Sequence, residues 1–270
     1  MQSLYGAIAN TNKKEIMVSI NYVYQKVLAL ANKEQRGYIT PQEFNLFADQ
    51  AQQEIFEQYF YDLNQSMRLP GNNAGHSDIV TNIEEKISLF ERYDRKVSNV
   101  SDSEYNLLGI TNDGAPSLYR LSMVRIDYGQ GKVDAEEIQI NELNKYIGSK
   151  LGVPTKKRPV YSRFTEINSN PTSPAPGKKP TIKIYPEMVS SNDLYVSYIE
   201  KPIKPEWGYE IVGDKALYNS DNSNNFELHE SEESELVYRI LALAGLAIQK
   251  PELTQTAAAL EGAKVQQEKQ

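Results

Sequence analysis

Apolar residues recur at helical spacing over the first third of the chain. On a helix predicted over residues 15–32, the apolar face carries Ile16, Ile20, Val23, Val27 and Leu30. A second helix is predicted from Pro41, because Thr40 and Glu43 have the spacing of a capping box around its first turn. Its apolar face carries Phe44, Ala48, Ala51, Ile55, Tyr59 and Leu63. The link between them is short, so we expect an antiparallel helical hairpin.

A third helix is predicted after a stretch of turn-forming residues. Ser66–Asp78 contains Leu-Pro-Gly-Asn-Asn and is predicted as a loop. Asp78 is the expected cap of a helix whose apolar side carries Ile79, Ile83, Ile87 and Phe90. The run from Ile79 to Ile83 is also compatible with a strand.

The spacing changes to the alternation of strands from about Val97. Tyr105–Ile110 and Ser117–Asp127 are predicted as strands, with Asn112-Asp113-Gly114 as the turn of a hairpin between them. Asp134–Leu151 is predicted as a short helix. Further short strands are predicted at Val160–Ile167, Thr181–Tyr185, Leu194–Glu200, Leu217–Tyr218 and Phe226–Leu228. The close turn signals favour a mostly antiparallel sheet.

One segment within this region has the composition of an extended arm. Asn168–Pro180 contains four prolines, which exclude a helix, and it is flanked by two predicted strands. We expect this arm to project and to contact a partner. The candidate contact residues are Pro171, Pro174, Pro176, Lys178 and Lys179.

The last part of the chain returns to helical character. Ser231 is the expected cap of a helix with glutamates in its first turn, within Glu230–Glu235. Leu236–Ile248 is almost wholly apolar but too short to span a bilayer, so we expect a helix buried on most sides. Lys250-Pro251 is the predicted start of a further helix.

Together these elements predict an α+β fold with two parts. Residues 1–96 and 229–270 are expected to pack as one helical unit, with the N-terminal hairpin against the C-terminal helices. Residues 97–228 are expected to form a β-rich, mostly antiparallel lobe from which the arm at 168–180 projects.

Composition excludes several kinds of chemistry. The 270 residues include no cysteine and only two histidines, which removes thiolate catalysis and Cys-ligated metals. The chain has no phosphate-binding loop, no G-x-S-x-G and no H-E-x-x-H, so neither an enzyme nor a metal or cofactor site is expected. The net charge of −7 disfavours nucleic-acid binding as the main function. The 18 tyrosines are typical of chains that form interfaces.

Both ends of the chain resemble structural proteins of tailed bacteriophages, notably short-tailed crAss-like and marine phages. The resemblance lies in Lys26–Asn45, Phe226–Leu228, Leu236–Leu241, Ala244-Gly245 and Gln249–Leu253. It implies a head-to-tail connector, or adaptor, that assembles in the bacterial host cytoplasm and forms a ring beneath the portal of the virion. Twelve copies are what the resemblance implies for such a ring.

A connector ring has to let double-stranded DNA pass without holding it. Acidic residues on its inner wall would repel the phosphate backbone, and the candidates are Asp134, Glu136 and Glu137, together with Glu230–Glu235. The expected partners are copies of the same chain, the portal and other tail or ring proteins, with no membrane.

Two other classes of protein are compatible with the residues. One is a tail-associated hydrolase that acts on cell-wall polymers. The other is a carbohydrate-binding or host-recognition module, in which Trp207 and Tyr209 would act as aromatic platforms. A ring is distinguished from both by its mass, because it forms one large and discrete species.

Overall fold

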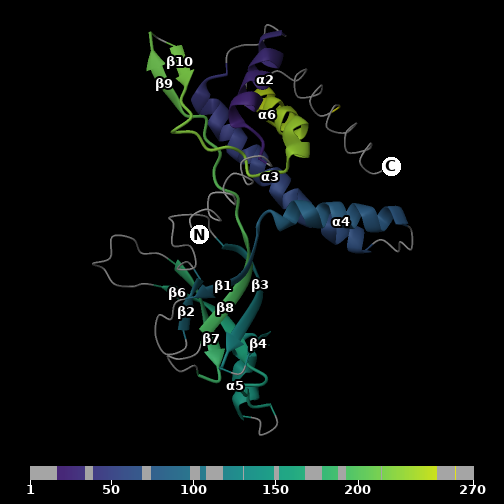
Figure 1. Ribbon diagram of the computed structural model, residues 1–270, viewed down its shortest axis with the longest axis vertical. Coiled ribbons are helices and arrows are strands. Elements are labelled where there is room, and N and C mark those ends of the chain that lie inside the picture. The colour runs from purple at the N-terminus through teal and green to yellow at the C-terminus, as the bar shows by residue number, and fades with distance from the viewer. Residues whose placement is uncertain are drawn as a thin grey trace, which may run out of the picture. The chain divides into compact units, whose positions relative to one another are not determined.

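The computed structural model has an α+β fold that divides into two compact units. One unit, here called the helical unit, comprises Met1–Leu89 and Pro202–Gln270, and the other, the β unit, comprises Phe90–Lys201 (Figure 1). The structure describes residues 17–33, 39–68, 74–97, 104–107, 118–129, 131–148, 152–167, 178–187, 193–213, 215–247 and 259.

Segments from both ends of the chain build the helical unit. Helix α6 packs against both α2 and α3, while α4 packs against α3 (Figure 1). Its described helices are α2 (Ile20–Lys33), α3 (Pro41–Arg68), α4 (Ala74–Ser88), the 3₁₀ turn η2 (Glu230–Glu232) and α6 (Glu233–Ala247). The helices predicted near residues 15–32 and from Pro41 are therefore present. The residues that link them, 34–38, lie outside the described part.

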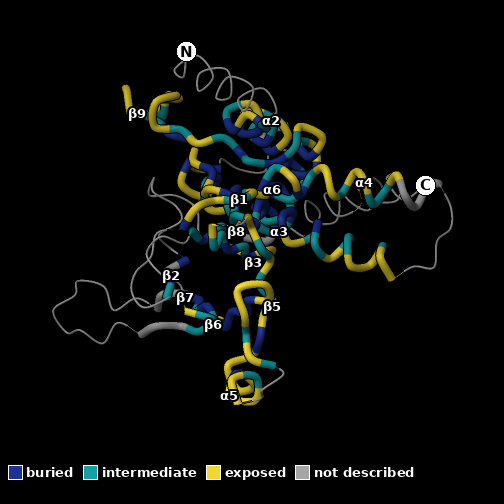
Figure 2. The backbone as a smooth tube through the Cα atoms, turned by 60° about the horizontal axis from the view of Figure 1, so that its bottom comes forward, coloured by how far each residue is buried: buried dark blue, intermediate teal, exposed yellow. Residues whose placement is uncertain are grey.

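The predicted capping box of α3 is formed. The Thr40 hydroxyl accepts from the backbone N–H of Glu43 at 3.3 Å, and the Glu43 carboxylate accepts from the Thr40 backbone N–H at 3.0 Å. Behind this cap, the predicted apolar face of α3 is buried at every position up to Tyr59 (Figure 2). Helix α6 meets it with Leu236, Ile240 and Ala244, all fully buried.

Two helix starts differ from the prediction. Helix α4 begins at Ala74, so Asp78 lies inside it and the predicted loop is shorter at both ends. The helix at the C-terminal end is preceded by η2, whose cap is His229 rather than Ser231. The His229 ring nitrogen Nδ1 accepts from the backbone N–H of Ser231 at 3.2 Å. Ser231 itself occupies the first turn, where its own N–H needs an acceptor.

An irregular segment, residues 202–229, runs along these helices. Two amide side chains of α3 hold it. The Asn45 side chain exchanges hydrogen bonds with the backbone of Trp207, at 2.8 and 3.3 Å. The fully buried Gln52 donates to the carbonyl of Ile203 at 2.8 Å and accepts from the N–H of Glu227 at 3.0 Å. Phe226 and Leu228 are fully buried, but Phe226–Leu228 is not a strand as predicted.

The same segment contains a two-stranded antiparallel ribbon, here called the β9–β10 ribbon. Its strands are β9 (Tyr209–Val212) and β10 (Lys215–Tyr218). The β10 strand was predicted in part and β9 was not. At the base of the ribbon, the Gly208 N–H donates to the Ser223 hydroxyl at 2.9 Å, and the Gly208 carbonyl accepts from Asn219.

The β unit consists of two four-stranded sheets with one shared core. One sheet has the order β1-β8-β3-β4 and the other β2-β7-β6-β5, with β5–β6 as a parallel pair in the otherwise antiparallel arrangement. Tyr105, Val124, Ile182 and Val196, from strands of both sheets, lie in a single cluster of buried side chains. The strands are β1 (Glu91–Val97), β2 (Glu104–Asn106), β3 (Leu118–Asp127), β4 (Lys132–Asp134), β5 (Glu136–Glu137), β6 (Val160–Ile167), β7 (Lys178–Tyr185) and β8 (Asp193–Glu200).

Most predicted strands of the β unit are present, but two local predictions are wrong. Strands β2 and β3 do not form a hairpin, because β2 pairs with β7 and β3 pairs with β8 and β4. The predicted turn at 112–114 lies outside the described residues. The helix predicted over Asp134–Leu151 is reduced to α5 (Ile140–Gly148), since β4 and β5 use the residues before it for sheet pairing.

The unit boundaries also differ from the predicted 96/97 and 228/229. Strand β1 belongs to the β unit because it pairs with β8, and residues 202–228 belong to the helical unit because α3 binds their backbone.

We predict that Gly208→Ala destabilises the helical unit. A Cβ at this position would lie 2.4 Å from the backbone oxygen of Asn222, so the ribbon base would have to shift. We expect a loss of about 1–3 kcal/mol in the free energy of unfolding, measured by denaturant titration. Gly148→Ala is the control, because its Cβ would meet no atom within 4 Å. Equal stability of the two variants would contradict the prediction.

We also predict that the β unit loses stability in alkaline solution. Burial is the main cause that raises the pKa of Tyr105, Tyr161 and Tyr198 above 10, and it raises the pKa of Tyr128 to about 12. The unfolded chain therefore releases these protons first. Stability is fully present below pH 10 and falls as the pH rises toward 12.

Unfolding free energy against pH, followed together with tyrosinate absorbance, measures this effect. Tyr128→Phe should reduce the alkaline loss. It should cost little near neutral pH, because the Tyr128 hydroxyl has no hydrogen-bond partner among the described residues. Unchanged stability up to pH 12 would contradict the prediction.

Candidate functional site

The predicted arm corresponds to the connection between β6 and β7. Lys178 and Lys179 lie in β7, where they pair with Ile167 and Glu166 of β6. The arm is therefore shorter than predicted, since its last residues belong to the sheet. Residues 168–177, which include Pro171, Pro174 and Pro176, lie outside the described part of the chain.

Each of the three acidic candidates in the β unit is paired with an arginine. Asp134 lies 3.8 Å from Arg125, Glu136 lies 3.2 Å from Arg158, and Glu137 lies 2.5 Å from Arg163. Glu137 also accepts a hydrogen bond from the Tyr161 hydroxyl at 3.2 Å. These carboxylates are exposed, but most of their negative charge is compensated locally.

The acidic run at residues 230–235 contributes two buried carboxylates. Glu232 is 1% exposed and Glu235 is 5% exposed, so neither can face a water-filled passage. Their burial corrects the prediction of a continuous acidic surface over Glu230–Glu235. A buried carboxylate needs a compensating charge, and both have one in the helical unit, as described below.

Trp207 lies at the centre of an aromatic cluster in the helical unit. It is 4% exposed, and its ring centroid lies 4.3 Å from that of Tyr24 and 5.8 Å from those of Tyr209 and Tyr218. Its indole N–H donates to Asn21 at 3.1 Å. Trp207 is therefore a core residue that supports the β9–β10 ribbon, and its ring is not free to act as an exposed platform.

The ribbon itself exposes apolar side chains on both faces. Tyr209, Ile211, Ala216 and Tyr218 share one face, and Val212 and Leu217 share the other with Glu210 and Lys215. Ile211 is 73% exposed, Val212 57% and Leu217 52%. Exposed apolar residues that gather in one place, unlike scattered ones, mark surfaces for protein contact.

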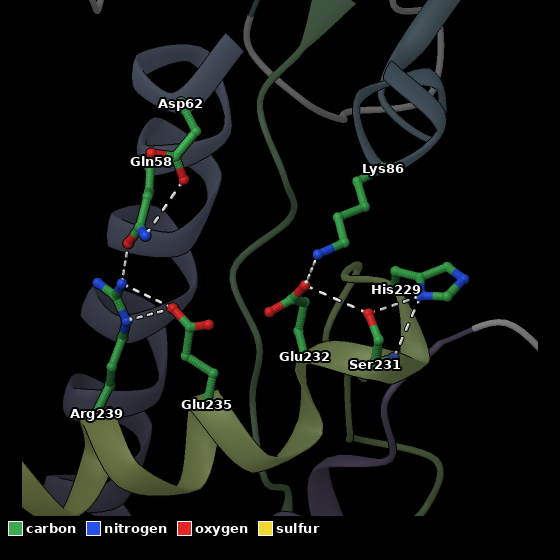
Figure 3. Close-up of polar contacts among 8 residues, drawn as sticks. All are labelled: Gln58, Asp62, Lys86, His229, Ser231, Glu232, Glu235 and Arg239. Atoms are coloured by element: carbon green, nitrogen blue, oxygen red, sulfur yellow. Dashed lines mark hydrogen bonds and ion pairs between the residues drawn. The ribbon is translucent and has the colours of Figure 1, made fainter. Parts of the chain in front are cut away.

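A cavity of about 610 Å³, here called the α3–α4–α6 cavity, is the second notable surface of the helical unit. Ile55 and Tyr59 of α3 and Ile79 and Ile83 of α4 form its apolar wall. Residues of η2 and α6 form its polar floor (Figure 3). Mixed lining of this kind suits an occupant with both apolar and charged parts.

Two ion pairs with buried carboxylates lie at the floor of this cavity. Lys86 reaches from α4 to Glu232 at 2.5 Å, and Glu232 also accepts from the Ser231 hydroxyl (Figure 3). Arg239 donates twice to Glu235, at 2.7 and 3.0 Å, and once to the Gln58 side chain. The first pair joins α4 to η2, the second lies within α6, and the hydrogen bond to Gln58 joins α6 to α3, so the floor is charged but internally compensated.

Two further carboxylates, Asp62 and Glu85, lie among the lining residues. Asp62 accepts a hydrogen bond from Gln58 at 3.4 Å, and Glu85 is exposed. Neither forms an ion pair with another described residue. The cavity lining therefore carries negative charge that its one lysine, Lys86, and the neighbouring Arg239 do not compensate.

The described residues contain no group of three or more side chains arranged to hold a metal ion. Within the same residues, no helix combines the length and the apolar character needed to cross a membrane. The segment Asp221–Asn225 forms part of the irregular segment, and its hydrogen-bond partners lie outside it: Asn219, Ser220, Glu206, Gly208 and the backbone N–H of Ile20.

The sequence matches no protein-family model, and no curated protein is similar enough to it to count as a relative.

We predict that Lys86 and Glu232 are energetically coupled. Lys86→Met, Glu232→Gln and the double variant form a thermodynamic cycle whose coupling energy should be roughly 0.5–3 kcal/mol, since the carboxylate is buried. Denaturant unfolding of the four proteins measures it. The control cycle is Lys96→Met with Asp193→Gln, an exposed pair that should show no measurable coupling. Absence of coupling at Lys86 would contradict the assigned contact.

Proposed function

We propose that this chain is a virion structural protein that forms a head-to-tail connector ring beneath the portal and links capsid to tail. The observation that carries the proposal is the β9–β10 ribbon. It combines exposed Ile211, Val212 and Leu217 with strand edges that pair with no other described strand. The resemblance of the chain ends to phage structural proteins supports the same function.

A ribbon of this kind gains stability when another surface covers it. Two-stranded sheets are marginally stable alone, and burial of a large apolar side chain contributes about 1.5–3 kcal/mol. A contact between the ribbon and a different surface of the next copy is heterologous, and a set of heterologous contacts that closes gives a ring. The ribbon thus supports a subunit in a closed assembly.

Passage of DNA through such a ring would depend on overall charge more than on a local acidic wall. Asp134, Glu136 and Glu137 are compensated by arginines, so they supply little repulsion. The net charge of −7 on each copy still opposes binding to phosphates. We therefore propose that the duplex passes without specific binding. The β6–β7 connection remains a proposed partner contact on the basis of its sequence.

The test is the mass of the purified chain and of its ribbon variants. Mass photometry over a concentration series should show one large and discrete species, and electron microscopy should show closed rings. Ile211→Asp or Leu217→Asp should weaken assembly at least about tenfold while leaving the melting temperature of the monomer unchanged. Both side chains are already exposed within a single copy.

Leu46→Asp is the matched control, because Leu46 is 63% exposed on α3, outside the ribbon. It should assemble like the wild type. A chain that stays monomeric at every concentration, or ribbon variants that assemble normally, would contradict the proposal.

A further inference from the structure

We propose that the α3–α4–α6 cavity of one copy receives the basic turn Thr155–Arg158 of the next copy. The proposal rests on the connector function above, since it names one contact of the ring. It follows from the charge and shape of two surfaces that belong to different units of the chain.

The turn is a compact basic projection of the β unit. Thr155 and Arg158 exchange backbone hydrogen bonds in both directions, at 3.2 and 2.9 Å, so Lys156 and Lys157 occupy the tip. Both lysines are exposed. Val153, which precedes the turn, is 48% exposed and adds apolar surface. The closed turn reduces the entropy that would be lost on docking.

The cavity offers the complementary chemistry. Asp62 and Glu85 supply carboxylates without ion-pair partners among the described residues, and Ile79 and Ile83 supply an apolar wall. Lysine side chains fit this combination, because their aliphatic stems pack against apolar surface while the ammonium groups meet carboxylates. A volume of about 610 Å³ accommodates two or three side chains.

The proposed contact is heterologous, which is the kind of contact that builds a ring. The turn belongs to the β unit and the cavity to the helical unit, so the contact joins two different surfaces of successive copies. Such a contact repeats from copy to copy and closes when the rotation between copies allows it. Two lysines that meet two carboxylates would also fix the register of neighbours.

Crosslinking gives a direct test, because the chain has no cysteine. Lys157→Cys and Glu85→Cys variants, each with a single thiol, are mixed and treated with a short bismaleimide. A covalent dimer of one variant with the other is expected on denaturing gels. Mixing two single variants ensures that the product joins different copies.

Each of two control pairs keeps one thiol site of the test pair and moves the other to a residue outside the proposed contact. Glu84→Cys is adjacent to Glu85 but does not line the cavity, and Lys145→Cys is exposed on α5 of the β unit. Either control thiol should give little mixed dimer with its partner. Yields equal to those of the Lys157–Glu85 pair would overturn the proposal.

Charge reversal measures the contact independently. Lys157→Glu and Glu85→Lys should each weaken association about tenfold, and the two together should restore it, while Glu84→Lys should have little effect. Rings that form with neither crosslinking nor charge rescue overturn the contact and leave the connector function standing. Specific crosslinking in a protein whose native mass, measured by mass photometry, never exceeds that of a dimer supports the contact and overturns the ring.

Discussion

The helical unit depends on one constraint, which is that an irregular segment buried against helices must have its backbone hydrogen bonds satisfied. The segment over residues 202–229 has no sheet of its own to provide partners, apart from the ribbon. Gln52, fully buried on α3, meets this need by binding Ile203 and Glu227, and Asn45 does the same for Trp207. An apolar residue at position 52 would leave two partly buried backbone groups without these partners.

The surfaces proposed for assembly follow from this arrangement. Because α3 holds the segment near Trp207, the β9–β10 ribbon is anchored at its base and its apolar residues remain outside the core. The same helix contributes Tyr59 and Asp62 to the α3–α4–α6 cavity. Helix α3 therefore supports both the apolar and the acidic contact surface, while α6, which packs against both α2 and α3, completes the core.

Charge is distributed differently in the two units. The helical unit buries Glu232 and Glu235 in compensated pairs, one between α4 and η2 and the other within α6, where these carboxylates cannot attract a partner. The β unit leaves Asp134, Glu136 and Glu137 exposed but opposite arginines. Lys157 in the basic turn and Asp62 and Glu85 in the cavity have no ion-pair partner among the described residues, so their charges are available for recognition between copies.

The sequence by itself determined the elements that local spacing controls. The α3 cap at Thr40 and Glu43, its buried face and the strand Val160–Ile167 follow from the period of apolar residues and from capping chemistry. Only the tertiary structure decided which strands pair, which glutamates are buried, and that Gln52 and Lys86 have structural partners. These outcomes depend on residues far apart in the chain, for example Gln52 with Glu227. The sequence around a polar side chain looks the same whether that side chain binds water or a distant backbone group.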